Sequence, residues 1–316
     1  MYLLGVDIGG TAIKIGVLDE FGKIIRKTQI KTQNLSQESE IKNVAKAIDK
    51  LLEENKISKS QIKGVGVGCP GAIDGDRGIV KYSSNLKWKD FCLKSELESL
   101  IKLPVRLAND ADAATLGEAI FGSAKGYKTV IMLTLGTGVG GGIVINKKLY
   151  EAPKGMGAEL GHIVVKKGGL PCGCGRRGCL EQYASATALI RQTKTAMLKN
   201  PNSLLWEVSK NDINNVDGKT SFIAERLGDK TAKRVINNYI SYLGEGLLDY
   251  CNIFRPDAIV IGGGISNEGE ILISKLVKYL KKYEYGYKGT PRAEILLASL
   301  KNDAGIIGSG SLVMEL

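Results

Sequence analysis

The sequence has no long hydrophobic run and no recognisable targeting segment. No apolar stretch reaches the ~18–20 residues that a membrane-spanning helix needs. The N-terminus lacks the basic flank and apolar core of a signal peptide, because Met1–Asp7 leads directly into a strand-like segment. We therefore expect no membrane association and a cytoplasmic location.

Proline, histidine and blocks of like charge are also scarce. The 316 residues include seven prolines and one histidine, and 43% are hydrophobic. This composition is typical of a globular protein with a sizeable core, and the length allows two domains. The net charge is +11, but Lys and Arg are spread along the chain without a block of five like charges. A solvated basic surface is therefore favoured over a nucleic-acid partner.

Cysteine is present but unevenly placed. Six cysteines in a chain expected to be cytoplasmic argue against a disulfide framework. Cys172, Cys174 and Cys179 fall within eight residues, and the only histidine, His162, lies ten residues before the first of them. Three thiolates and one imidazole make a closed tetrahedral set for Zn²⁺, with no position left for water. This pattern predicts a structural zinc site, and a redox-active Cys-x-Cys pair is the alternative.

Strand and helix patterns alternate along the chain. Strands are expected at Leu3–Val6, Ala12–Leu18, Lys23–Thr32, Gly64–Gly68, Val105–Ala108, Thr129–Leu135, Gly142–Ile145, Ala258–Ile261 and Glu294–Leu300. Helices are expected at about Glu38–Glu54, Asp110–Phe121, Ser185–Leu198, Thr231–Phe254, in a segment ending near Leu280, and at Asp303–Val313. The polar stretch Asn200–Thr220 is interpreted as an irregular surface segment.

The two halves of the chain repeat one pattern. Each opens with a hairpin whose turn is glycine-rich, and α/β units follow. This weak duplication predicts an α/β fold of two similar lobes with a cleft between them. The N-terminal lobe is expected to comprise residues 1–117 plus 303–316, and the C-terminal lobe residues 118–302.

The first hairpin turn has the composition of a phosphate-binding loop. Asp7 ends a strand and is followed by Gly9, Gly10 and Thr11. Glycines let backbone N–H groups approach phosphate oxygens. Thr11 adds a hydroxyl donor, Lys14 adds charge, and Asp7 is the candidate for holding Mg²⁺ through water.

A second loop, Gly136-Thr137-Gly138, also follows a strand, and Gly263 and Gly264 follow a third. No Gly-Lys-Ser/Thr sequence accompanies either of the first two loops, so they do not form a P-loop. Each could be only a tight hairpin, but a glycine followed by threonine in each half favours phosphate binding. Gly263 and Gly264 are the candidates for contacting adenosine.

The order of these three motifs resembles the actin-like ATPase superfamily, whose members share a ribonuclease H-like fold and include hexokinases and ROK proteins. The resemblance implies two lobes around a cleft, with ATP and Mg²⁺ bound there.

Asn109 and Asp110 end a short strand before a helix. Phosphoryl transfer to an alcohol needs a base that accepts the hydroxyl proton. Asp110 is the candidate base, and Asn109 the candidate for a neighbouring sugar hydroxyl. The alternative is that Asp110 only caps the helix. Asp112 is the weaker competitor for the role of base, and it departs from the Asn-Asp-Ala-Asn sequence usual in the family.

The loop at the end of the expected strand Gly64–Gly68 also carries the family resemblance. Gly68-Cys69-Pro70-Gly71 resembles the Gly-x-Pro-Gly loop beside the sugar, which makes Gly71 a candidate sugar contact. Cys69 and Cys92 themselves are expected to be small core residues.

The segment from Cys172 to Glu181 is similar to the ROK signature Cys-x-Cys-Gly-x-x-Gly-Cys-x-Glu at every fixed position. The resemblance implies that Glu159, His162 and Glu181 face the sugar, and that His162 uses one ring nitrogen for zinc and the other for a sugar hydroxyl.

The resemblance implies an ATP-dependent sugar kinase that phosphorylates a hexose at O6. The run from Gly155 to His162 looks most like glucokinases, so glucose is the expected substrate. Kinases for N-acetylmannosamine, N-acetylglucosamine, allose or fructose are alternatives, as are polyphosphate as donor and a non-catalytic sugar sensor. ROK repressors carry a DNA-binding domain before the first loop, which here begins at residue seven. A homodimer or homotetramer is expected from the family alone.

Overall fold

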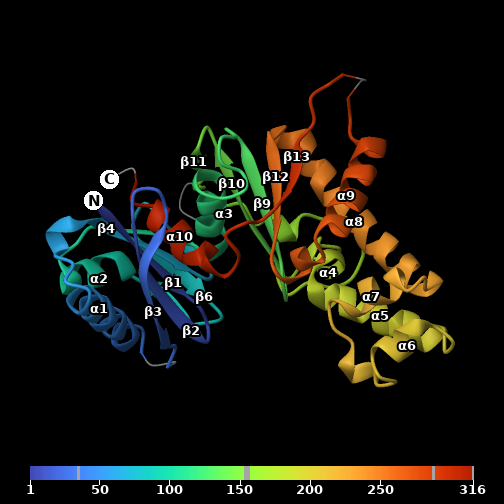
Figure 1. Ribbon diagram of the computed structural model, residues 1–316, viewed down its shortest axis with the longest axis horizontal. Helices are drawn as coiled ribbons and strands as arrows, with labels where there is room; N and C mark the ends of the chain where they lie inside the picture. Colours follow the sequence, from blue (N-terminus) through green and yellow to red (C-terminus); the bar gives the residue numbers. More distant parts are fainter. Residues whose placement is uncertain (34–35, 153–156, 287–288, 315–316) are drawn as a thin grey trace. The chain divides into compact units, whose positions relative to one another are not determined.

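The computed structural model describes residues 1–33, 36–152, 157–286 and 289–314 (Figure 1). Within these ranges the chain forms two compact units. The first comprises Met1–Val130, Gly142–Ala158 and Ser299–Leu316, and the second comprises Ile131–Gly141 and Glu159–Ala298. The lobe boundaries expected from the sequence stay a prediction. None of the helices in the described ranges is both long and apolar enough to cross a membrane.

The first sheet has the strand order β3-β2-β1-β4-β8. Its strands are β1 (Tyr2–Ile8), β2 (Ala12–Leu18), β3 (Ile24–Lys31), β4 (Ile62–Cys69) and β8 (Val105–Asn109). β1, β2 and β3 form an antiparallel meander, whereas β4 and β8 run parallel to β1. The carboxyl ends of β1, β4 and β8 therefore meet at one edge of the sheet, where ligands bind in open α/β sheets.

The second sheet repeats this connectivity in the order β11-β10-β9-β12-β13. Its strands are β9 (Val130–Leu135), β10 (Val139–Ile145), β11 (Lys148–Leu149), β12 (Ala258–Gly262) and β13 (Glu294–Leu297). In both sheets the second strand of an opening hairpin lies between the first and the third, and later strands extend the other side. The duplication predicted from the sequence is thereby confirmed. A small third sheet, not predicted, contains β5 (Ala72–Asp74), β6 (Ile79–Ser83) and β7 (Trp88–Phe91).

The helices confirm most of the helix predictions. They are α1 (Gln37–Glu54), α2 (Leu93–Ile101), α3 (Asp110–Ile120), α4 (Glu181–Ala184), α5 (Ala186–Lys199), α6 (Leu204–Val208), α7 (Thr220–Arg226), α8 (Lys230–Phe254), α9 (Glu270–Tyr283) and α10 (Ala304–Ser311). Every predicted strand is also present, although β13 ends three residues early. The helices α2, α4, α6 and α7 were not predicted.

Helix α10 lies against the first sheet at unusually short range. A Cβ atom on Gly5 of β1 would lie 1.9 Å from the Ile306 carbonyl oxygen, and one on Gly66 of β4 would lie 1.7 Å from that of Ser309. Because any side chain at these positions would collide with the helix backbone, the two glycines fix how closely α10 approaches. This brings the first turn of α10 to the edge where Asp7 lies.

The interpretation of Asn200–Thr220 as an irregular surface segment is wrong. It contains α6 and buries Leu205 and Val216 in a small core with Met197. Ser203 caps α6, and the indole N–H of Trp206 donates to the Met197 carbonyl at 3.2 Å. A few apolar residues among many polar ones were enough to anchor the segment. Cys92 also departs from expectation, because it is exposed at the start of α2, whereas Cys69 is buried as predicted.

Candidate functional site

Three parallel strands of the first unit end in residues that the sequence singled out. Register pairs Asp7 of β1 with Gly68 of β4, and Cys69 of β4 with Asn109 of β8. The candidate Mg²⁺ residue, the Gly-x-Pro-Gly loop and the candidate base are therefore neighbours along one sheet edge. The sheet topology thus assembles residues that lie about a hundred positions apart in sequence.

The first glycine-rich loop is a tight turn in which two carbonyls accept hydrogen bonds from Thr32. The N–H of Gly9 donates to the Ala12 carbonyl at 3.0 Å, which closes the hairpin. Thr32, at the end of β3, donates its backbone N–H to the Thr11 carbonyl at 3.1 Å and its hydroxyl to the Gly9 carbonyl at 2.7 Å. With two carbonyls engaged and Gly10 and Thr11 exposed, the loop can present N–H and hydroxyl donors to an anion.

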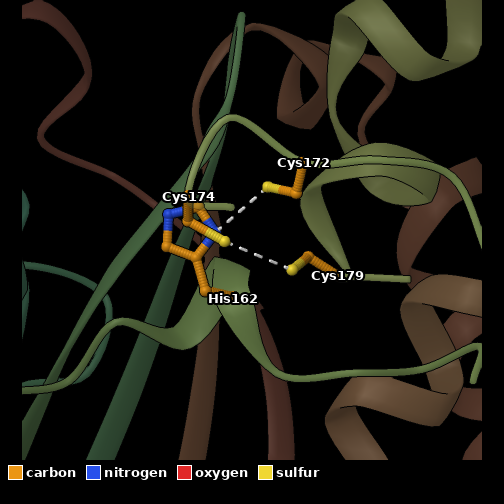
Figure 2. A group of neighbouring side chains, drawn as sticks. All are labelled: His162, Cys172, Cys174 and Cys179. Carbon is orange, nitrogen blue, oxygen red and sulfur yellow. Dashed lines mark hydrogen bonds between the residues drawn. The ribbon is translucent and has the colours of Figure 1, made fainter. Parts of the chain in front are cut away.

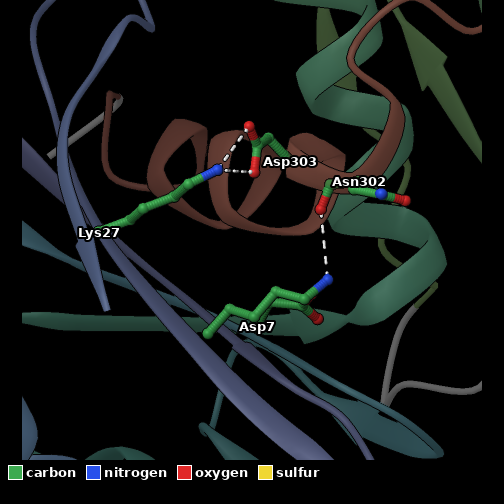
Figure 3. Close-up of polar contacts among 5 residues, drawn as sticks. Asp7, Lys27, Asn302 and Asp303 are labelled. Carbon is green, nitrogen blue, oxygen red and sulfur yellow. Dashed lines mark hydrogen bonds and ion pairs between the residues drawn. The ribbon is translucent and has the colours of Figure 1, made fainter. Parts of the chain in front are cut away.

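Asp7 is partly buried and paired with a lysine. Its Oδ2 lies 3.7 Å from Nζ of Lys14, the residue opposite it on β2, and the same Nζ donates to the Asn302 carbonyl at 3.3 Å. Burial raises the pKa of the Asp7 carboxyl above its ordinary value, and the charge of Lys14 opposes this shift. A Cβ on Gly305 would lie 2.4 Å from Asp7 Oδ2, so the carboxylate lies against the first turn of α10. Figure 3 shows Asp7 and the hydrogen-bonded Asn302 carbonyl beside the separate Lys27–Asp303 ion pair.

A carboxylate that is paired with one lysine and lies beside a helix N-terminus can instead accept a hydrogen bond from a water bound to Mg²⁺. Asp7 and Lys14 therefore have the chemistry expected for a site that holds Mg²⁺ and triphosphate together.

The structure decides which residue caps α3. Asn109 is the N-cap, and its Oδ1 accepts from the N–H groups of Ala111 at 2.8 Å and Asp112 at 3.4 Å. Asp110 is the first helical residue, and its Oδ1 accepts from the Ala111 N–H at 2.9 Å. Asn109 therefore caps the helix, and the capping role does not explain why Asp110 is present.

Asn109 keeps one donor for a ligand. Its Nδ2 donates to the Gly71 carbonyl at 3.0 Å, while its amide oxygen is fully used by the cap. Since an amide nitrogen carries two hydrogens, one remains to meet a sugar hydroxyl. Asp112 and Asn109 both line a small cavity of about 20 Å³ with Tyr150.

Gly71 must be glycine for two independent reasons. Its φ of +114° lies in a region that other residues rarely adopt, and an added Cβ would lie 2.2 Å from the Tyr82 carbonyl oxygen. The neighbouring Cys69 is a core residue, and burial together with the charge of Asp110 raises the pKa of its thiol. Cys69 therefore supplies packing and not a nucleophile.

The second glycine-rich loop is built like the first. The N–H of Ala186 donates to the Gly136 carbonyl at 2.8 Å, and the hydroxyl of Thr187 donates to the Thr137 carbonyl at 2.8 Å. Both donors come from the first turn of α5. A backbone N–H and a threonine hydroxyl thus hold two loop carbonyls in each unit, which supports the same role for both loops.

Glu181 joins the second loop to the cysteine cluster. Its Oε2 accepts from the Val139 N–H at 3.2 Å, and its Oε1 accepts from the Cys172 thiol at 3.8 Å. A Cβ on Gly138 would lie 2.5 Å from Oε2. A side chain at position 138 would therefore displace the Glu181 carboxylate from its present place.

His162, Cys172, Cys174 and Cys179 gather their ligand atoms within 4.8 Å of one another (Figure 2). Cys172 Sγ lies 3.6 Å from His162 Nδ1, and Cys174 Sγ lies 3.6 Å from Cys179 Sγ. In a tetrahedral zinc site with ordinary bond lengths, two sulfurs lie about 3.8 Å apart and a sulfur and a nitrogen about 3.6 Å apart. The four residues therefore fit Zn²⁺ in both identity and spacing.

The backbone shapes this cluster for metal binding. Gly178 has a φ of +83°, and an added Cβ would lie 1.8 Å from the Lys166 carbonyl oxygen. The Arg176 N–H holds the pKa of the Cys174 thiol below its ordinary value, whereas burial raises the pKa of the Cys179 thiol to about 12. A buried thiol of this kind becomes a thiolate when a cation binds it.

His162 and Glu159 lie together before the zinc loop. The His162 N–H donates to the Glu159 carbonyl at 3.0 Å, and the Glu159 side chain is exposed. Since Nδ1 faces the cysteines, Nε2 carries the proton when Nδ1 binds a metal, and it can donate to a hydroxyl. Gly155 and Met156, part of the run that resembles glucokinases, lie outside the described residues.

The third glycine motif follows β12. Gly263 has a φ of +80°, and Gly263 and Gly264 are both exposed. The Ser266 hydroxyl donates to the Gly263 carbonyl at 2.7 Å, which closes the turn. The exposed turn leaves room for a ligand, as its proposed contact with adenosine requires.

Sequence reasoning missed Thr32, Thr187 and the Asn302 carbonyl. Thr32 and Thr187 each hold a loop that is distant in sequence, and the Asn302 carbonyl accepts from Lys14 on β2. No local motif marks any of the three. The repeated pairing of a threonine with a glycine-rich loop is visible only once the hairpins are folded.

The comparisons with known proteins agree with these observations. The model of the ROK family matches residues 3–315. A glucokinase of Halalkalibacterium halodurans is 40% identical over 321 residues, which cover 99% of this chain and 95% of that protein. A glucokinase of Thermotoga maritima is 39% identical, with 99% of this chain and 97% of that protein covered. The crystal structure of a ROK family glucokinase from Streptomyces griseus, in complex with glucose and AMPPNP, is similar with a TM-score of 0.81 at 36% identity over the whole of both chains. The predicted fold class is thereby confirmed.

Proposed function

The chain belongs to the ROK family, and we propose that it transfers the terminal phosphoryl group of ATP to O6 of glucose. The observation that carries the proposal is the common edge of β1, β4 and β8. A loop suited to phosphate follows β1, and Asp110 follows β8 on the other side of β4. The similarity to glucokinases that extends over nearly the whole chain supports glucose as the hexose.

The nucleotide is held by the glycine-rich loops. Gly9, Gly10 and Thr11 offer N–H and hydroxyl donors to the phosphates, and Gly136, Thr137 and Gly138 do the same in the second unit. Gly263 and Gly264 leave room for adenosine. Lys14 would contact the phosphates, and Asp7 would hold Mg²⁺ through its bound water. The metal, when bound, neutralises charge on the phosphate oxygens.

Asp110 is the proposed general base. As the sugar oxygen approaches phosphorus, Asp110 accepts its proton, and the oxygen becomes a better nucleophile. The Ala111 N–H, bonded to Oδ1 at 2.9 Å, holds the carboxylate in one orientation. Asn109 contributes its remaining N–H to a neighbouring hydroxyl, and Gly71 keeps the loop beside it free of side-chain bulk.

Glu159, His162 and Glu181 are proposed to bind further sugar hydroxyls, since carboxylates accept and the His162 Nε2–H donates. His162, Cys172, Cys174 and Cys179 would hold a structural Zn²⁺ that fixes the loop carrying these residues. Thiolate ligands suit the cytoplasm, where thiols stay reduced, and we propose that compartment. A homodimer or homotetramer is proposed as the assembly.

The test is ADP release by the purified protein with Mg-ATP and a panel of hexoses and N-acetylhexosamines. We expect turnover with glucose, and a much lower kcat/KM with every N-acetylated sugar. Polyphosphate replaces ATP in a parallel arm, where we expect no glucose 6-phosphate. Turnover restricted to an N-acetylated sugar would refute glucose as the substrate, and sugar binding without any turnover would favour a sensor.

Two matched variants test the base. Asp110→Asn keeps an oxygen that can accept from Ala111 but removes the basic group, so kcat should fall about 10²–10⁴-fold with little change in glucose affinity. Asp112→Asn makes the same substitution two residues further along α3 and should keep most of the activity. If Asp112→Asn loses as much turnover as Asp110→Asn, the assignment is wrong.

A further inference from the structure

A cavity of about 580 Å³ lies in the second unit between α5 and α8, outside all residues assigned above to sugar or nucleotide. Its volume is in the range of small-molecule sites. Its walls come from both helices, from Leu170 at the start of the zinc loop and from Tyr183 just after it.

The cavity is cationic. Arg191, Lys199 and Arg234 line it, and none of its lining residues is an aspartate or glutamate. Within the described residues none of these three cations takes part in an ion pair. Arg191 donates to the Gln182 carbonyl, and Arg234 donates to the Asn200 side-chain oxygen at 3.3 Å, so both have neutral acceptors. Clustered cations without counter-charge favour an anion, and guanidinium groups suit phosphate in particular.

One wall of the cavity is aromatic. The rings of Tyr183 and Tyr242 lie 4.3 Å apart between centroids and are tilted by 30°. Nζ of Lys166 lies within 6 Å of both centroids, at 5.9 Å and 5.8 Å, and donates to the Tyr242 hydroxyl at 3.2 Å. Together with Leu170 and Val235, these rings offer a surface that a sugar or base ring can cover.

We propose that this cavity is a second ligand site that binds an organic phosphate, with the phosphate on Arg191, Lys199 and Arg234 and the attached ring against Tyr183 and Tyr242. Hexose phosphates and nucleoside monophosphates share this chemistry. The site differs from the glycine-rich loops, because it binds the phosphate through side-chain cations.

The position of the cavity links it to the residues proposed to bind sugar. Arg191 holds the carbonyl of Gln182, and Gln192 Nε2 donates to the Tyr183 carbonyl at 2.9 Å. The Tyr183 hydroxyl accepts from the Leu170 N–H at 2.7 Å. An anion that draws Arg191 toward itself would therefore act on the backbone directly after Glu181.

The test is isothermal titration with three probes: glucose 6-phosphate in saturating glucose, AMP in saturating Mg-AMPPNP, and inorganic phosphate. The saturating ligands fill the sugar and nucleotide sites, so that the heat observed comes from elsewhere. We expect at least one organic phosphate to bind once per chain, about tenfold more tightly than inorganic phosphate because only it contacts the tyrosines. Which of the two binds identifies the ring.

The double variant Lys199→Gln/Arg234→Gln should weaken this binding at least about tenfold, since two charge-assisted contacts are lost. Its matched control is Lys194→Gln/Lys233→Gln, which removes two lysines from the same helices outside the cavity and should bind as the wild type does. All four residues lie outside the proposed catalytic machinery, so kcat in the absence of organic phosphate should be unchanged in both.

Three results would overturn the proposal. They are the absence of saturable binding once the other sites are filled, equal affinity for all three probes, and binding that the control variant loses as fully as the cavity variant. A self-association that the cavity variant abolishes, without phosphate binding, would likewise refute it and assign the surface to contact between copies of the chain. None of these readouts requires kinase activity, so a protein that binds glucose and Mg-AMPPNP without turnover would still test the proposal.

Discussion

Replacing Thr187 with valine would isolate one hydrogen bond to the second glycine-rich loop. The Thr187 hydroxyl donates to the Thr137 carbonyl at 2.8 Å, and Thr187 is exposed at the start of α5. Valine keeps nearly the same shape, so the substitution removes the bond without opening a cavity. The Ala186 N–H still holds the Gly136 carbonyl, and the loop is loosened at Thr137 alone.

The expected magnitude follows from the energy of one such bond. A neutral hydrogen bond contributes about 1 kcal/mol net, which corresponds to an about fivefold change in an equilibrium constant. If the bond preorganises the loop for phosphate, the Kd for Mg-AMPPNP should rise by this factor. The Kd for glucose should stay unchanged, because the sugar does not depend on the Thr137 carbonyl.

Isothermal titration of each ligand separately measures both quantities. Thr195→Val is the matched control, since Thr195 lies on the same helix and its hydroxyl donates to the Arg191 carbonyl at 2.9 Å within that helix. The control should leave both affinities at their wild-type values. An unchanged Kd for Mg-AMPPNP in Thr187→Val, or an equal rise for glucose, would refute the role assigned to the loop.

Two further variants test the metal site and the stability of the second unit. Cys174→Ser should lose its bound zinc, as measured by atomic absorption. The control Cys92→Ser changes an exposed thiol outside the cluster and should keep one zinc per chain. Stoichiometric zinc in Cys174→Ser would contradict the ligand assignment. Asp229 caps α8. Burial raises its pKa, but hydrogen bonds from Ala232, Leu204 and Ser203 outweigh burial and leave the pKa below its ordinary value. Its ionised form therefore stabilises the fold above the unfolded pKa, and this contribution is lost as pH falls through the lower folded pKa. Asp229→Ala should cost about 1–2 kcal/mol in urea unfolding at pH 7, and the cost should shrink as the pH falls through the folded pKa of Asp229. A cost that does not change with pH would contradict this account.

The sequence predicted those parts of the fold that local patterns control. Strand alternation and helical periodicity located β2 and α8 to within one residue, because their apolar faces repeat regularly. Glycines and carboxylates at strand ends located the loops, because few residues tolerate such turns. The spacing of Cys172, Cys174 and Cys179 after His162 predicted a cluster that the structure brings within 4.8 Å.

What the sequence could not supply depends on contacts between distant segments. Asn109 and Asp110 are both good capping residues, and only the backbone of β8 and α3 shows that Asn109 takes the cap. Thr32 lies 23 positions after Gly9, and Thr187 lies 50 after Thr137. No local pattern marks such pairs. The segment around α6 looked irregular because its apolar residues are few, although tertiary packing makes them sufficient.

The contacts of Glu181 bear on why a kinase would carry a structural metal site at all. One carboxylate oxygen accepts from the Val139 N–H next to the second glycine-rich loop, and the other lies 3.8 Å from the thiol of Cys172. The residue proposed to bind sugar is therefore fixed between the cluster and the nucleotide loop. Release of zinc would loosen the loop that carries Cys172 and Cys179, and Glu181, which follows Cys179 by two residues at the start of α4, would lose its fixed position. We therefore expect metal loss to weaken both sugar and nucleotide binding, whereas a loop that served the sugar alone would leave the Kd for Mg-AMPPNP unchanged.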